Sequence, residues 1–121
     1  MKTLSLISLF LIYSGNLLAN NITNLIQYSS VENAMNTLKN KNSANTSYQG
    51  GWTIISLIEN NNQAMWFFPP KKHAAYPAVI KKSIIVKGNA LETKIVTLCE
   101  AEKLECDKLI TQFKKINNNY K

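Results

Sequence analysis

The sequence contains no arginine, although it has 14 basic residues, all lysine, against seven acidic ones and a formal net charge of +7. Arginine is the side chain most used for bidentate recognition of bases and phosphates, so its absence argues against nucleic-acid binding. A lysine-rich surface still favours acidic partners. We therefore expect no nucleic-acid partner, and we keep anionic material of the cell envelope as a partner class.

Histidine and cysteine are also scarce, with one His and two Cys in 121 residues. That number is small for a zinc site, and the sequence lacks the Gly-x-Ser-x-Gly, His-Glu-x-x-His and phosphate-loop motifs. We expect no metal, no cofactor and no enzymatic activity. An enzyme that uses His73 is the alternative, and it would need a carboxylate or hydroxyl that the fold brings beside the imidazole.

No apolar run reaches the roughly 20 residues that a membrane-spanning helix needs. The longest one lies in Met1–Ala19, where Lys2 precedes a mostly apolar run over residues 4–12 and a small residue ends the segment. This pattern is typical of a secretory signal peptide. We expect cleavage after Ala19, a periplasmic or secreted location, no stable membrane insertion after cleavage, and one small α+β domain over residues 20–121.

Two segments precede the first predicted strand. Ser29 and Glu32 have the spacing of a capping box, and the apolar residues that follow recur at helical spacing, which predicts a helix over residues 30–39. Residues 40–51 are rich in Asn, Ser, Thr and Gly without an apolar period, and they predict a long loop.

Four β-rich runs follow, over residues 52–58, 63–68, 78–87 and 90–98. The turn residues between them predict two hairpins, and Gly88-Asn89 suits a two-residue turn. If Lys87 pairs with Ala90, then Val86 faces Leu91 and one face of the hairpin is largely apolar.

The last segment, residues 101–116, has an amphipathic helical pattern whose apolar stripe includes Leu109 and Phe113. The sequence therefore predicts an α+β fold in which a four-stranded antiparallel sheet, made of two hairpins, carries an N-terminal helix and a C-terminal helix packed on one face.

The residue types change from aromatic to basic and proline-bounded directly after the predicted strand at residues 63–68. Pro69 and Pro70 cannot donate ladder hydrogen bonds, so the strand must end there. The predicted binding residues lie in and next to the loop that follows: Trp66, Lys71, Lys72, His73 and Tyr76. Loops fixed by a scaffold often carry binding groups. The alternative is that the aromatic residues are core and the lysines merely solvate an ordinary loop.

The two cysteines, Cys99 and Cys106, are expected to form a disulfide if the chain is exported to an oxidising compartment. A continuous helix over both residues would separate their Cα atoms by about 10 Å, beyond the roughly 7 Å that a bridge tolerates. Thr97 and Glu100 could form a capping box that starts such a helix. The bridge requires Cys99 at the end of the strand and residues 100–102 curling back before the helix.

Three groups of residues carry a resemblance: Trp66-Phe-Phe-Pro, His73-Ala-Ala-Tyr-Pro77, and Cys99-Glu-Ala with Cys106-Asp107. Together they resemble a group of small exported proteins of Gram-negative bacteria that have an aromatic strand, a His-x-x-x-Pro loop and paired C-terminal cysteines. The resemblance covers about the C-terminal half of the chain. It implies a periplasmic location and a disulfide, and it implies no activity.

Small size, export and the missing catalytic motifs predict a non-enzymatic binding protein, such as an inhibitor or immunity-type partner of an envelope-acting enzyme. The expected partner is a periplasmic protein, bound by the aromatic and basic loop. The alternative is a module for anionic envelope components, with the lysine pairs at 71/72, 81/82 and 114/115 as contacts.

Overall fold

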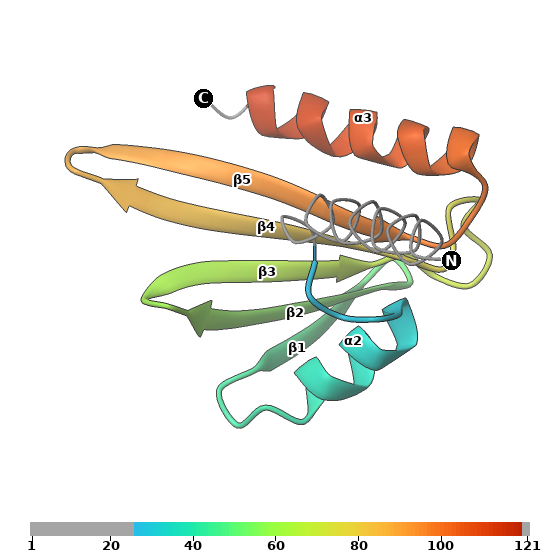
Figure 1. The fold of residues 1–121 in the computed structure, drawn as a ribbon, viewed down its shortest axis with the longest axis horizontal. Helices are drawn as coiled ribbons and strands as arrows, with labels where there is room; N and C mark the ends of the chain where they lie inside the picture. The colour runs from blue at the N-terminus through green and yellow to red at the C-terminus, as the bar shows by residue number, and fades with distance from the viewer. Residues whose placement is uncertain (1–25, 120–121) are drawn as a thin grey trace, which may run out of the picture.

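The structure is a computed structural model that describes residues 26–119, in which a five-stranded antiparallel sheet carries two helices (Figure 1). In chain order the elements are α2 (Val31–Lys39), β1 (Asn45–Gln49), β2 (Trp52–Glu59), β3 (Asn62–Phe68), β4 (Ala78–Lys87), β5 (Ala90–Cys99) and α3 (Lys103–Asn119). The predicted signal peptide lies outside the described residues.

Each strand pairs with its neighbour in the sequence, so the spatial order is β1-β2-β3-β4-β5. The prediction of four strands was wrong, because residues 45–49 of the expected loop form β1. This strand lies at the edge of the sheet and is mostly exposed, so it lacks the apolar alternation of a half-buried strand. Backbone pairing with β2 holds it in place, through the register Gln49↔Trp52.

Two-residue turns connect three of the hairpins. Gly50 and Gly51 have φ angles of +57° and +85°, which glycine adopts without steric cost, and they join β1 to β2. Asn60 and Asn61 join β2 to β3 with φ angles of 51° and 67°. The predicted register of the last hairpin is confirmed, because Lys87 pairs with Ala90 and Val86 with Leu91.

The helix α2 covers one face of the sheet. Its buried residues Ala34 and Leu38 join a cluster that includes Ile55, Trp66 and Val79. The helix begins after Ser30 rather than after Ser29 as predicted, and the Ser30 hydroxyl oxygen accepts a hydrogen bond from Asn33 N at 3.0 Å. Both adjacent serines are residues suited to capping, and the sequence alone does not distinguish them.

The helix α3 covers the other face. Leu109 joins a second cluster that includes Ala78 and Ile80, with Phe67 and Phe113 packed against it. Successive strand residues point to opposite faces, so Phe67 and Ile80 face away from Trp66 and Val79. The prediction that both helices pack on one face was therefore wrong, since the strands are apolar on both sides where the helices cover them.

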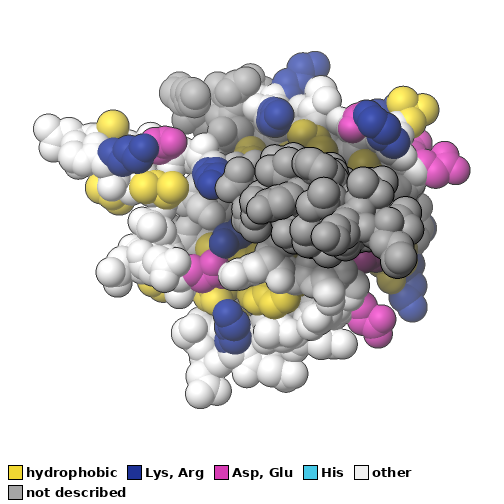
Figure 2. Space-filling model, in the orientation of Figure 1, with side chains coloured by type: hydrophobic (Ala, Val, Ile, Leu, Met, Phe, Trp, Pro, Cys, Tyr) yellow, Lys and Arg dark blue, Asp and Glu magenta, His cyan; other side chains and the backbone are white. Residues whose placement is uncertain are grey.

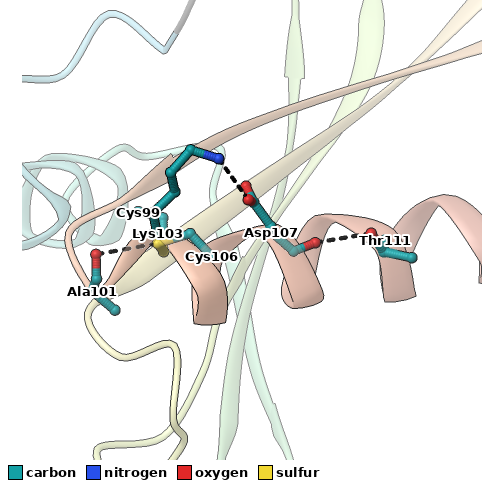
Figure 3. A network of polar contacts seen from close by, with 6 residues as sticks. All are labelled: Cys99, Ala101, Lys103, Cys106, Asp107 and Thr111. Atoms are coloured by element: carbon teal, nitrogen blue, oxygen red, sulfur yellow. Dashed lines mark hydrogen bonds and ion pairs between the residues drawn. A yellow bond between two sulfur atoms is a disulfide. The ribbon is translucent and has the colours of Figure 1, made fainter.

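The disulfide between Cys99 and Cys106 is present, with the Cα atoms 5.9 Å apart (Figure 3). The predicted geometry is confirmed, because β5 ends at Cys99 and residues 100–102 connect it to α3 without being helical. Lys103 and Asp107 then form an ion pair of 2.8 Å along the first turns of the helix. The bridge joins the last residue of the sheet to the first turn of α3.

Candidate functional site

The loop between β3 and β4, residues 69–77, is folded on itself. His73 N donates to Pro70 O at 3.0 Å, and Tyr76 N donates to His73 O at the same distance. The side chain of Ala75 is buried in the α3 cluster, which anchors the middle of the loop. The side chains that the loop presents to solvent are therefore held by a defined backbone.

A pocket of about 440 Å³ lies between this loop and the start of α2. We call it the Tyr76 pocket. It is lined by residues from α2, the end of β3, the loop and the residue after β5: Val31, Glu32, Met35, Phe68, Pro69, Lys71, Tyr76, Pro77, Ala78 and Glu100. Val31, Phe68 and Ala78 are buried and make the floor apolar, whereas Tyr76 is 40% exposed. Its volume lies within the range of pockets that hold small molecules or single side chains.

Charges of both signs lie around the Tyr76 pocket. Lys71 and Glu32 are exposed, and they come from the loop and from the first turn of α2. The Glu100 carboxylate accepts a hydrogen bond from Val31 N at 3.1 Å, where the helix dipole favours negative charge. Glu100 N also donates to Pro77 O at 2.8 Å. Glu100 thus fastens α2 to the loop and fixes the walls of the pocket.

Two of the five predicted binding residues, Lys71 and Tyr76, line the same pocket. Lys72 is exposed in the same loop but does not line the pocket. His73 is half-buried and Trp66 is only 1% exposed. The structure therefore brings together part of the predicted set and leaves Trp66 in the core.

The environment of His73 is mostly structural. Its Nδ1 accepts a hydrogen bond from Ala75 N at 3.0 Å, and its ring packs edge-on against Trp52 with centroids 5.4 Å apart. Among the hydrogen bonds of residues 26–119, none joins His73 to a carboxylate or a hydroxyl. The orienting group that a catalytic imidazole requires is not at this position in the described part of the chain.

Trp66 belongs to a polar network beneath α2. Its Nε1 donates to Glu59 Oε2 at 3.1 Å, and Lys81 Nζ lies 2.7 Å from Glu59 Oε1. The same Lys81 ammonium lies 4.9 Å from the centroid of the Trp66 ring, and Tyr28 packs edge-on against that ring. Lys81 is thereby engaged within the fold. Its neighbour Lys82 points to the opposite face of the sheet, so these two lysines do not form one contact surface.

Glu32 and Glu100 were not predicted to be pocket residues. They are separated by 68 positions, and only the packing of α2 beside the end of β5 brings them to one site.

Comparison of the chain with protein-family models, with curated proteins and with solved structures found no match. Within residues 26–119 no helix is long and apolar enough to cross a membrane. The same part of the chain gathers no group of three or more His, Cys, Asp or Glu side chains suited to holding a metal ion.

Proposed function

We propose that the protein is a small, non-enzymatic binding protein of the periplasm, and that it holds a partner protein at the Tyr76 pocket. An inhibitor or immunity-type partner of an envelope-acting enzyme would have this character. The observation that carries the proposal is a pocket with an apolar floor, a half-exposed aromatic residue and a rim of both charges. Aromatic and basic anchors around a desolvated pocket are typical of the residues that dominate protein interfaces.

The mixed rim favours a protein over purely anionic material. Lys71 would attract an anion, but Glu32 lies on the same pocket and would repel it. A protein partner can place an apolar side chain on the floor and complement both charges. The disulfide supports an oxidising compartment, where such bonds form and persist.

The test compares two tyrosines. Tyr76→Ala removes the aromatic wall of the pocket, and Tyr48→Ala removes an even more exposed tyrosine of β1 that does not line the pocket. Each protein is immobilised and exposed to an extract of the bacterial envelope. A captured protein is identified, purified and titrated against all three proteins. We expect Tyr76→Ala to weaken its binding about tenfold and Tyr48→Ala to leave it unchanged.

The salt dependence separates the two function classes. A packed aromatic anchor keeps most of its affinity at high ionic strength, whereas lysine contacts to an anion weaken steeply. If only anionic envelope material is captured, with equal loss at high salt in all three proteins, the partner-protein proposal is wrong and the lysine surface is the active feature.

A further inference from the structure

The outer half of the β4–β5 hairpin extends beyond the rest of the sheet. β3 pairs with β4 only as far as Gln63↔Ile84, so residues 85–92 pair with no strand other than each other. Figure 1 shows this hairpin reaching past the neighbouring strands. We call residues 85–92 the ribbon. A two-stranded ribbon is marginally stable in water unless something packs against it.

The ribbon nevertheless carries an exposed aliphatic pair. Val86 and Leu91 are directly opposite each other and are 66% and 71% exposed. Their side chains lie on the same face as Ile84, and Ile58, which is 63% exposed, shares that face on β2. An exposed aliphatic pair at the end of a projecting ribbon is placed where it can enter an apolar environment.

Lysines adjoin the ribbon on the two strands that carry this aliphatic pair. Residues 81–94 contain four lysines, of which two are in ion pairs, Lys81 with Glu59 at 2.7 Å and Lys87 with Glu92 at 2.8 Å. Figure 2 shows hydrophobic, basic and acidic side chains next to one another on the projecting hairpin. Lys82 lies on the aliphatic face itself, and Lys94 is exposed on the other face. The hairpin thus combines an apolar end with a net positive charge.

We propose that the ribbon docks on an anionic lipid bilayer, with Val86 and Leu91 entering the interfacial region and the lysines meeting the headgroups. Apolar burial together with attraction to anionic lipid is the combination that holds peripheral proteins at a membrane surface. This contact is interfacial and does not span the bilayer. It is separate from the Tyr76 pocket, which lies at the opposite end of β4, and it does not depend on the function proposed for that pocket.

A second copy of the chain fits this surface less well. Two copies would each bring a net charge of +7, so their association is opposed by like charges. A stable protein interface also buries about 800 Å² on each partner, which a few aliphatic side chains do not supply. An anionic surface satisfies both the charge and the small apolar area.

The experiment uses protein expressed from the full chain, purified after any processing in a Gram-negative host, with the N-terminus determined by mass spectrometry. Binding is measured by co-sedimentation with vesicles of phosphatidylglycerol and phosphatidylcholine, and with vesicles of phosphatidylcholine alone. We expect binding to the anionic vesicles that weakens at high salt. The double variant Val86→Ser, Leu91→Ser should lower this binding about tenfold or more.

Two further variants keep the test decisive. Tyr48→Ser changes an exposed apolar residue on the opposite edge of the sheet and should leave binding unchanged. Leu91→Trp adds a side chain that prefers the membrane interface and should strengthen binding severalfold. Equal binding by wild type and the double variant, or no binding to anionic vesicles, would overturn the proposal. So would a dimer in solution that the double variant dissociates, because the ribbon would then be an interface between copies.

Discussion

The two faces of the sheet are fastened to their helices by different means. On the face covered by α2, a hydrogen bond across 69 positions joins the start of the helix to Glu100, and the Glu59, Trp66 and Lys81 network links β2, β3 and β4 on that face. On the face covered by α3, it uses the disulfide and a group of aromatic contacts around Phe113.

This difference follows from where each helix lies in the chain. α3 directly follows β5, so a bridge that closes a short loop can fix its first turn. α2 has no covalent link of this kind to the sheet, and its first turn is held by Glu100, which is 69 positions away and meets Val31 only in the folded state. Loss of a core side chain should therefore affect the α2 face most, and loss of the bridge should affect α3 most.

The largest expected effect is that of Trp66→Ala. The substitution removes the largest fully buried side chain and leaves Glu59 without its indole donor. We expect the free energy of unfolding to fall by about 4 kcal/mol, measured by denaturant titration. Phe113→Ala on the α3 face is the counterpart, and because Phe113 is only half-buried the expected loss is about 2 kcal/mol. Equal losses of unfolding free energy in the two variants would show that the two faces of the sheet depend equally on their core side chains.

A smaller effect is expected when the bridge is removed by the double substitution Cys99→Ser, Cys106→Ser. The closed loop is short, so the chain-entropy contribution to the free energy of unfolding is about 2 kcal/mol. We expect amide hydrogen exchange to become faster mainly in α3, with α2 and the centre of the sheet remaining protected. Uniform acceleration over both helices would mean that the bridge stabilises the whole molecule rather than the junction.

The smallest effect concerns the part of the α2 face that α2 does not cover. The pKa of Glu92 is lowered, first by its hydrogen bond from Lys87 and then by the charge of that ammonium. Any stabilisation by this pair is therefore present above the ordinary carboxyl pKa and is lost as the pH falls through the lowered one. Both side chains are exposed to solvent, so we expect an NMR titration to detect the lowered pKa of Glu92 while the free energy of unfolding changes little.

Lys87→Gln is the matched variant for that titration. It should return the pKa of Glu92 toward its ordinary range, because both leading causes of the shift come from Lys87. An unchanged titration in the variant would place the cause elsewhere on the ribbon.

The well-predicted parts of the fold are those in which local chemistry and burial agree. The β4–β5 register followed from the turn at Gly88 and from alternation along the strands. β1 was missed because an edge strand can be polar on both faces, although Gly50-Gly51 is a hairpin-turn signal in its own right. The packing of the two helices on opposite faces of the sheet could not be predicted. The residue pattern of the strands is compatible with a helix on either face.

The candidate site was predicted only in part, because some of its residues meet only through the packing of distant segments. A proline-bounded loop indicated Lys71 and Tyr76, and both line the pocket. Trp66 was predicted to be a binding residue because it is aromatic, but an aromatic residue in a strand is equally suited to a hydrophobic core. The acidic side of the pocket arises from residues that are distant in sequence, and a single sequence contains no signal for that contact.

The strand order has a consequence for how the chain acquires its structure. Because every strand pairs with the strand next to it in sequence, the sheet can form by successive local steps, which favours rapid folding. α2 is the exception, since it precedes all the strands and contacts Glu100 across 69 positions. During synthesis, the contact between the start of α2 and Glu100 can form only after β5 has been made, and the Tyr76 pocket is completed at that final step.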